Sequence, residues 1–220
     1  AEMWDIAPEL IAAGDDRPVR ARIAEQLVDP ATFLERIRVA RQNPTGYETH
    51  DELERLDGRV FERYASPLRG PDGRHYGRVV FLRDISERRR TQDELLKLTQ
   101  ALEQSPESII VTDTEACIEY VNAAFIGHAG YTRDEAIGKN PRFLQSGRTP
   151  PETFTALWAA LTAGQSWAGE FINRRKDGSD YLEYARVAPI RRADGRITHY
   201  LTVSEDISEK RRIADELDRH

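Results

Sequence analysis

Apolar residues along this 220-residue chain follow two periods, one of two residues and one of three to four. Residues 108–122 carry β-branched side chains on both sides of a polar turn, which predicts two short strands. Residues 149–164 place apolar side chains three and four apart, which predicts a helix capped by Thr149 and ended by Gly164. The apolar stripe of this predicted helix, which we expect to pack in the core, consists of Phe154, Leu157, Trp158 and Leu161.

A longer segment occurs twice. The sequence DGRVFERYASPLRGPDGRHYGRVVFLRDISERRR, from Asp57, returns from Asp177 as DGSDYLEYARVAPIRRADGRITHYLTVSEDISEKRR. Each copy alternates strand-like runs with Asp-Gly dipeptides, and Asp-Gly between strands is a strong signal for a hairpin, since both turn residues must tolerate positive φ. Each copy is therefore expected to end in an antiparallel hairpin followed by a charged helix.

The two copies differ in what precedes them. Residues 1–46 offer helical pieces around Ile11, Ile23 and Phe33 but no strand pair, so the first copy is expected to be incomplete at its N-terminal end. The predicted organisation is a partial domain at 1–86, a linker helix at 87–105, a complete domain at 106–209 and the start of a C-terminal signalling helix at 210–220.

The linker between the copies has a narrow apolar seam. Leu95, Leu98 and Leu102 lie three and four residues apart, a spacing that suits a helix pairing with a second helix in a coiled coil. We expect a homodimer through these linker helices. The alternative is a helix that packs on its own domain.

Two aspartates end the strands before these helices. Asp84 and Asp206 stand immediately before Ile-Ser and a basic helix, so each carboxylate is expected to cap that helix or to pair with an arginine.

Composition excludes several classes of protein. Apolar residues make up 39% and charged residues 32% of the chain, which is typical of a folded protein with solvated faces. A net charge of −6 argues against a nucleic-acid partner, and no apolar run approaches the roughly 20 residues needed to cross a membrane. The single cysteine, Cys117, rules out an internal disulfide and suits a cytoplasmic location. Because no catalytic triad, phosphate loop or metal-spaced cluster is present, we expect no enzymatic activity in these residues.

Several segments resemble the PAS domain family. Asp-Ile-Ser followed by Glu and basic residues resembles the end of a PAS domain in both copies, and three segments of the second copy resemble the rest of it: VTDTEACIEYVNAAF, GYTRDEAIGKNP and INRRKDGSDYLEYARVAPI. The resemblance implies an α+β fold, with a five-stranded antiparallel sheet and short helices on one face, in two copies joined by a helical linker. It also implies a sensory module of a multidomain bacterial-type sensor or two-component system, with a covalently linked histidine kinase or diguanylate cyclase as output domain. Ala116 departs from the family, which usually has a turn glycine there, and is expected to loosen the first hairpin without touching the pocket.

Within the family, GKNPRFLQ resembles the flavin-contacting motif of LOV photoreceptors, with Pro141 in place of their reactive cysteine. The resemblance implies that Asn140 and Gln145 face the ribityl chain and ring of a flavin, and Arg142 its phosphate. It places Asn173 against the polar edge of the ring.

Trp158, Trp167 and Gly169 resemble the FAD-binding PAS domains of aerotaxis receptors and of redox regulators, which need no cysteine. Two positions depart from the photoreceptor pattern, since Glu183 replaces the second ring-edge asparagine and Ser204 the switching glutamine. Redox sensing through FAD or FMN is therefore expected instead of light sensing, and a cofactor-free module for dimerisation and signal relay is the alternative.

Strand geometry supports part of this site. Residues two apart share a face of a strand, so Phe171 and Asn173 are expected to point into one pocket together with Glu183, Thr202 and Ser204 of the following strands. No catalytic residue and no metal ligand is expected. The predicted cofactor-binding residues are Asn140, Arg142, Gln145, Trp158, Trp167, Asn173, Glu183 and Ser204.

Overall fold

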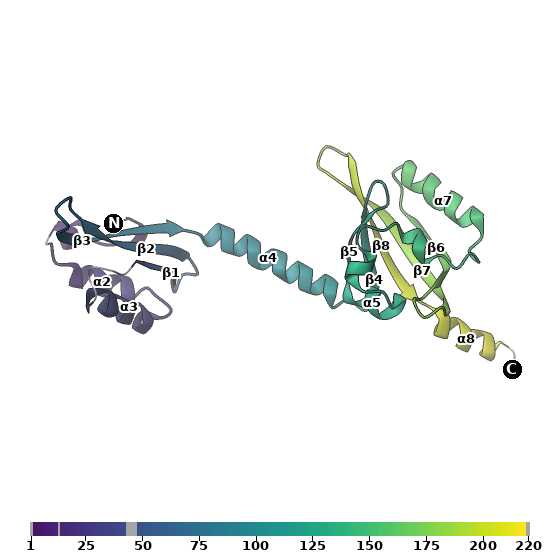
Figure 1. The fold of residues 1–220 in the computed structure, drawn as a ribbon, viewed down its shortest axis with the longest axis horizontal. Helices are drawn as coiled ribbons and strands as arrows, with labels where there is room; N and C mark the ends of the chain where they lie inside the picture. Colours follow the sequence, from purple (N-terminus) through teal and green to yellow (C-terminus); the bar gives the residue numbers. More distant parts are fainter. Residues whose placement is uncertain (1, 13, 43–47, 219–220) are drawn as a thin grey trace. The chain divides into compact units, whose positions relative to one another are not determined.

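The structure is a computed structural model that describes residues 2–12, 14–42 and 48–218 (Figure 1). The chain divides into two compact units, residues 1–96 and 97–220. Each unit contains its own antiparallel sheet.

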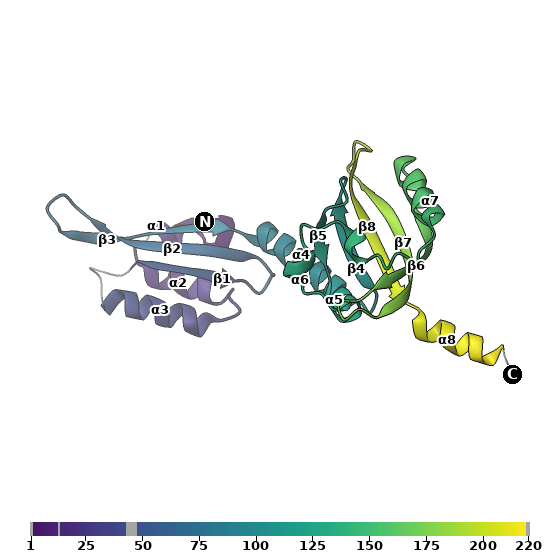
Figure 2. The same ribbon diagram turned by 45° about the vertical axis from the view of Figure 1, so that its right-hand side comes forward.

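The first unit is a three-stranded sheet in the order β1-β2-β3, with helices packed against it (Figure 2). Phe61 is fully buried, and its ring lies 4.8 Å from that of Trp4. The predicted helical pieces around Ile11, Ile23 and Phe33 are confirmed, and no strand precedes them among residues 2–12 and 14–42. The elements of this unit are η1 (Glu2–Trp4), α1 (Pro8–Ala12), α2 (Asp16–Ala24), α3 (Pro30–Gln42), β1 (Thr49–Glu54), β2 (Val60–Arg69) and β3 (His75–Asp84).

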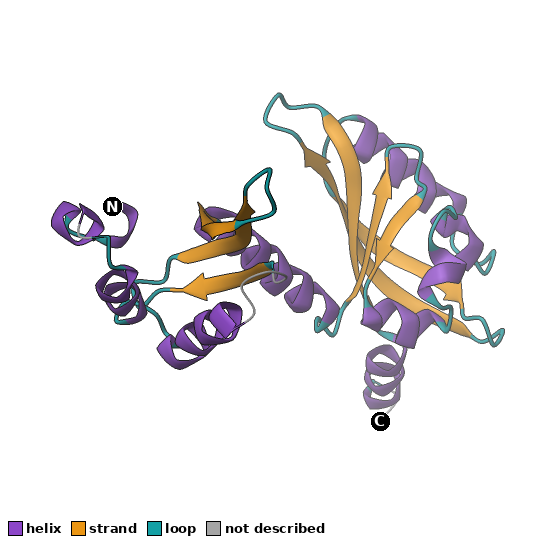
Figure 3. Cartoon of the chain, turned by 60° about the vertical axis from the view of Figure 1, so that its left-hand side comes forward, coloured by secondary structure: helices purple, strands orange, loops and turns teal. Residues whose placement is uncertain are grey.

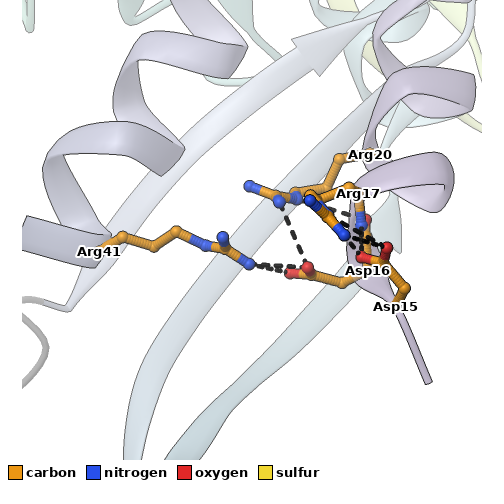
Figure 4. Close-up of polar contacts among 5 residues, drawn as sticks. All are labelled: Asp15, Asp16, Arg17, Arg20 and Arg41. Carbon is orange, nitrogen blue, oxygen red and sulfur yellow. Dashed lines mark hydrogen bonds and ion pairs between the residues drawn. The ribbon is translucent and has the colours of Figure 1, made fainter.

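Ion pairs tie α2 to α3 (Figure 4). Asp15 caps α2 by accepting the backbone N–H of Arg17 at 3.0 Å. Asp16, in the first turn of α2, accepts hydrogen bonds from Arg20 at 3.2 Å and from Arg41 of α3 at 2.6 Å. Because Asp16 and Arg41 are exposed, their ion pair contributes at most about 1 kcal/mol and mainly fixes the register of the two helices.

Helix α4 (Ser86–Glu103) follows β3 directly. Asp84 accepts the backbone N–H of Ser86 at 2.9 Å and its hydroxyl at 2.5 Å, which confirms the predicted capping role. Leu98 and Leu102, of the predicted seam, are 58% and 42% exposed. The predicted linker region is therefore helical over most of its length, while its role as a linker remains a prediction.

The second unit contains a five-stranded antiparallel sheet in the order β5-β4-β8-β7-β6, which is visibly twisted in Figure 3. The two strands predicted within residues 108–122 are present, and Phe125, Ala129 and Leu144 pack against them in an apolar core. The elements of this unit after α4 are β4 (Ser108–Asp113), β5 (Ile118–Val121), α5 (Ala123–Ala129), α6 (Arg133–Ala136), η2 (Pro141–Leu144), α7 (Pro151–Thr162), β6 (Trp167–Arg174), β7 (Asp180–Arg191), β8 (Ile197–Asp206) and α8 (Ser208–Leu217).

The predicted Asp-Gly hairpins are present, but in each pair only the glycine has positive φ. Between β2 and β3 only Gly73 has positive φ, and its N–H donates to Gly70 O at 3.0 Å. Asp72 instead accepts the N–H of Arg74 at 3.0 Å, and the strand register shifts at Arg69. This is a type I turn followed by a glycine bulge, which adds residues to the loop and leaves only the glycine in the left-handed region. The β7–β8 turn repeats it, with a register shift at Arg191.

Ala116 lies in the turn between β4 and β5 with φ +61°, a conformation that L-residues adopt at a cost. The expectation that it stays clear of the pocket is wrong, because Ala116 is buried and lines the cavity described below.

Replacing Ala116 with Gly should raise the free energy of unfolding of the second unit by about 0.5–1 kcal/mol, because glycine adopts this φ without strain. The control is Ala159→Gly in the exposed interior of α7, which should lower it by about 1 kcal/mol. Denaturant unfolding measures both. A loss of stability in the Ala116→Gly protein would mean that the buried methyl group matters more than the backbone strain.

Helix α7 begins differently from the prediction. Its N-cap is Pro150, and Thr149 makes no cap. The Thr149 hydroxyl instead accepts the N–H of Ile172 at 2.8 Å and donates to its carbonyl at 3.3 Å, so it ties the start of α7 to β6. The predicted end is confirmed, since Gly164 has φ +72° just after the helix.

Helix α8 covers most of the predicted C-terminal helix, of which residues 219–220 lie outside the described residues. Ile213 and Leu217 are exposed on it. None of the helices that the structure describes is both long enough and apolar enough to span a bilayer.

Candidate functional site

A cavity of about 440 Å³ lies between the sheet of the second unit and the segments α7 and η2. Strands β4, β6, β7 and β8 contribute residues that lie two apart, as one face of a pleated sheet requires. The structure brings Phe171 and Asn173 of β6 together with Glu183 of β7 and Thr202 of β8 at this cavity, as the pleat predicted.

One end of the cavity is polar. Asn173 Nδ2 donates to Glu183 Oε2 at 2.6 Å, and the Ser204 hydroxyl donates to Glu183 Oε1 at 2.5 Å. All three residues are buried: Asn173 is 7% exposed, Glu183 8% and Ser204 2%. We refer to Asn173, Glu183 and Ser204 as the polar corner. Ser204 lies behind Glu183 and does not itself line the cavity.

Burial dominates the electrostatics of the polar corner. Removal from water raises the pKa of Glu183, and the hydrogen bonds from Ser204 and Asn173 oppose this rise only in part. The pKa of Tyr181, two residues earlier on β7, is also raised by burial and then by the nearby Glu183. The carboxyl group of Glu183 therefore stays protonated to a higher pH than an exposed carboxyl group does.

The segment from Gly138 to Arg148 forms one rim of the cavity. Asn140 caps η2 by accepting the N–H of Arg142 at 3.1 Å, and Gln145 pairs with Asn173 of β6 in an isolated β-bridge. Asn140, Arg142 and Gln145 all line the cavity, together with Pro141 between the first two. Gly147, with φ +81°, turns the chain toward α7.

Aromatic rings line another part of the cavity. Phe154 of α7 stacks on Phe171 of β6 with ring centroids 5.6 Å apart. Trp158 meets Tyr200 edge to face at 6.2 Å, and both line the cavity. The expectation that Trp158 packs in the core is wrong: it is 43% exposed, because a cavity lies on the sheet side of α7 where a packed core was expected.

Trp167 is placed beside the cavity wall and is not among the residues that line it. Its ring lies 5.0 Å from that of Phe171 and folds over Gly169. A Cβ on Gly169 would stand 2.4 Å from the Trp167 ring, so the missing side chain makes room for the indole. Trp167 therefore supports Phe171 from behind.

Sequence reasoning missed several lining residues, among them Tyr200 of β8 and Thr112 of β4. Alternation back from Thr202 would have found Tyr200, because residues two apart share a face. Thr112 lies two residues after Ile110, which also lines the cavity, but no polar partner in the sequence pointed to it.

The end of β8 is tied to the rest of the unit at Asp206. This carboxylate accepts the backbone N–H of Ser208 at 3.0 Å and its hydroxyl at 2.6 Å, and it forms an ion pair with Arg175. Arg175 also donates to the carbonyl of His128 and lies 4.4 Å over the ring of Tyr181. The predicted arginine partner of Asp206 is confirmed. The N-cap of α8 is Ile207, and Asp206, one residue before it, accepts the N–H of the first helical residue.

The chain is similar to known proteins of regulation and sensing by their names. The chain is 36% identical over 119 residues to a nitrogen fixation regulatory protein of Klebsiella oxytoca, a match that covers 54% of this chain and 24% of that protein. It is 31% identical over 113 residues to a blue-light-activated histidine kinase of Brucella anthropi, covering 50% of this chain and 23% of that protein. The chain thus spans about a quarter of the length of these curated relatives.

A solved PAS domain of a protein from Colwellia psychrerythraea superposes with a TM-score of 0.50 at 23% identity, covering 53% of this chain and 99% of that chain, and this likeness concerns the fold. Residues 106–209 match the family described as PAS domain. The family match and the five-stranded antiparallel sheet with its helices together identify residues 106–209 as a PAS domain, a module of sensing and signal transduction.

Proposed function

We propose that the PAS domain senses redox state through a flavin, FAD or FMN, bound in its cavity. The observation that carries the proposal is the polar corner at one end of a cavity whose walls also carry aromatic and aliphatic side chains. A planar ring system with a single polar edge needs such surroundings, since its faces are apolar and its edge requires hydrogen-bond partners. The similarity to a nitrogen fixation regulatory protein agrees with a regulatory role.

The side chains present fit such a group. Asn173 offers both a donor and an acceptor to a ring edge, and Phe154 and Phe171 provide apolar faces for a ring. Arg142 supplies a guanidinium for a phosphate, and Asn140 and Gln145 supply amides for a polyol chain. A bound flavin supplies reversible electron transfer, while these residues bind and orient it.

We infer that the signal leaves along β8. Thr202 lines the cavity, Ser204 bonds Glu183, and Asp206 bonds Ser208, the first residue of α8, so three alternate residues of one strand connect the cavity with the helix. An output domain linked covalently to these helices, a histidine kinase or a diguanylate cyclase, would receive the signal. The relative named a blue-light-activated histidine kinase has such an output by name.

The first unit is proposed to be a second, N-terminally incomplete PAS copy, with boundaries 1–86 before the linker. The support is a repeated junction: Ile85 N–H donates to Val60 O, and Ile207 N–H donates to Leu182 O, each at 2.9 Å. The bulges of the β2–β3 and β7–β8 hairpins also recur at matching places.

An absorption spectrum of the purified chain tests the flavin proposal. We expect flavin bands that bleach on chemical reduction and return in air, and no adduct under blue light, because Pro141 cannot form a thiol adduct. A colourless protein that takes up neither FAD nor FMN on refolding would remove the redox function.

A cofactor-free module for dimerisation and signal relay is the second candidate. The observation that favours it is the row of exposed leucines on α4, which includes Leu98 and Leu102. Such a row suits a helix that pairs with a second copy of itself.

Replacing Leu98 with Glu should convert a homodimer into a monomer, because two buried carboxylates would face each other across the helix pair. Sedimentation of the wild-type and variant chains measures this. Gln100→Glu, an exposed change elsewhere on the same helix, serves as control and should leave the assembly unchanged. A wild-type monomer at high micromolar concentration would contradict the helix-pairing proposal.

A further inference from the structure

Glu183 is a carboxyl group where the fold itself needs none. Glu183 stands opposite Asp206 in the β7–β8 ladder, and in the first unit the residue opposite Asp84 is Phe61. Phe61 is fully buried in an apolar core. Since the same ladder position accepts phenylalanine in the other repeat, the carboxyl of Glu183 points to a role in the cavity.

Among the residues that the structure describes, no arginine or lysine forms an ion pair with Glu183. Arg175 is the nearby base, but it forms its ion pair with Asp206. From β7, Tyr181 faces the same region, and from η2 the guanidinium of Arg142 lines the cavity. Burial is the largest cause that raises the pKa of Glu183. The hydrogen bonds from Ser204 and Asn173 lower it, Asp206 raises it further, and Arg175 makes the smallest of these contributions by lowering it. A buried carboxyl without its own counter-ion is most stable in the neutral form.

A neutral carboxyl offers a paired donor and acceptor, one O–H beside one C=O. Both oxygens of Glu183 already accept one hydrogen bond, from Asn173 and from Ser204, and each retains a further lone-pair direction. A ring edge with N–H next to C=O, as in a cyclic imide or lactam, matches this pair: its N–H donates to the C=O of the carboxyl group, and its C=O accepts from the O–H. An ionised carboxylate would accept the N–H but repel the adjacent carbonyl oxygen.

We propose that Glu183 is the specificity-determining residue of the cavity and that its neutral carboxyl group pairs with an imide or lactam edge of the bound ring through two parallel hydrogen bonds. This inference rests on the proposed function, because a flavin presents such an imide edge. It adds to that function that the affinity for the ligand depends on whether the carboxyl group of Glu183 is protonated.

The sign of the pH dependence follows from the neutral form. Above the pKa of Glu183 in the ligand-free protein, binding must first restore the proton, so affinity should fall about tenfold for each further pH unit. Below that pKa the affinity should be constant.

The test is riboflavin binding, followed by quenching of flavin fluorescence between about pH 5 and pH 9, with the full 220-residue chain. Glu183→Gln carries an amide that keeps one donor and one acceptor but does not titrate, and it should bind with no pH dependence in this range. Glu183→Leu should bind weakly at every pH. Glu170→Gln removes an exposed carboxylate of β6 and should keep the wild-type pH profile. An N3-methylated flavin lacks the imide N–H and should lose most of the affinity in the wild-type chain.

The outcomes separate this inference from the proposed function. Flavin binding that is independent of pH in the wild-type chain, or that strengthens as pH rises, overturns the role of Glu183 and leaves the flavin sensor intact. Binding of neither riboflavin nor lumiflavin at any pH overturns both. Thermal unfolding then still reports on Glu183 alone: the wild-type chain should lose stability relative to Glu183→Gln as pH rises, and equal profiles would show that the carboxyl is not held neutral.

Discussion

Replacing Asn173 with Ala is expected to lower flavin affinity by about ten- to a hundredfold, equivalent to about 1 to 3 kcal/mol. The amide of Asn173 is buried in the polar corner, so its removal leaves the ring edge of the ligand unpaired in a place that water reaches poorly. It also removes the N–H that bonds Glu183 Oε2. Fluorescence titration with FAD, FMN and riboflavin measures the loss, and all three should weaken by a similar factor because they share the same ring.

Two controls define what this result means. Gln165→Ala, which removes an amide in the loop after α7, should leave the affinity unchanged. Arg142→Ala should weaken FAD and FMN but not riboflavin, because riboflavin has no phosphate. Equal affinity in the Asn173→Ala and wild-type chains, with both folded by thermal unfolding, would place the ring edge elsewhere.

The sheet face of the cavity could be predicted from sequence because strand periodicity is strict. Counting in twos from Asn173 gives Phe171, and the repeat fixes where β7 and β8 run, which leads to Glu183 and Thr202. The short stretch around Pro141 was found only through its resemblance to a family motif, because a 3₁₀ turn leaves no periodic signal.

Other features depend on tertiary contacts that a local pattern does not contain. Thr149 before Pro150 has the local signature of a helix cap. Its hydroxyl instead accepts the backbone N–H of Ile172 on β6, a contact that the local sequence does not contain. The apolar stripe of α7 correctly identifies the face of the helix that points toward the sheet. It does not show whether side chains or a cavity fill the space between helix and sheet, so Trp158 was expected in a packed core. The conformation of the Asp-Gly turns depends on one extra residue in the loop, which the dipeptide alone does not reveal.

The junction at Asp206 yields the second large effect. Asp206→Ala should lower the free energy of unfolding of the second unit by about 2 to 3 kcal/mol, because it removes the hydrogen bonds from the backbone N–H and the hydroxyl of Ser208 and leaves the partly buried Arg175 without its carboxylate. The neighbouring Glu205→Ala is the matched control. Glu205 pairs with Lys210 on the surface, so its loss should change stability by less than about 1 kcal/mol.

The pH dependence of this loss has a definite sign. Partial burial alone would raise the pKa of Asp206, but the hydrogen bonds from Ser208 and the ion pair with Arg175 outweigh it and hold the pKa below its ordinary value. The stabilisation is therefore complete above the ordinary pKa of about 3.9 and is lost as pH falls through the lower pKa of the folded state. The wild-type and Asp206→Ala chains should accordingly converge in stability in acid.

Glu183 should behave in the opposite way, since its pKa is raised and the wild-type chain loses stability as pH rises above about 4.5. The two carboxyls stand opposite each other across β7 and β8, with Arg175 paired to only one of them. If that arrangement links the cavity to α8, Asp206→Ala should also increase hydrogen exchange in the first turn of α8 by roughly tenfold or more, the equivalent of about 1.4 kcal/mol. Unchanged exchange in α8, together with wild-type stability, would show that Asp206 couples nothing to the helix and that the signal leaves the domain by another route.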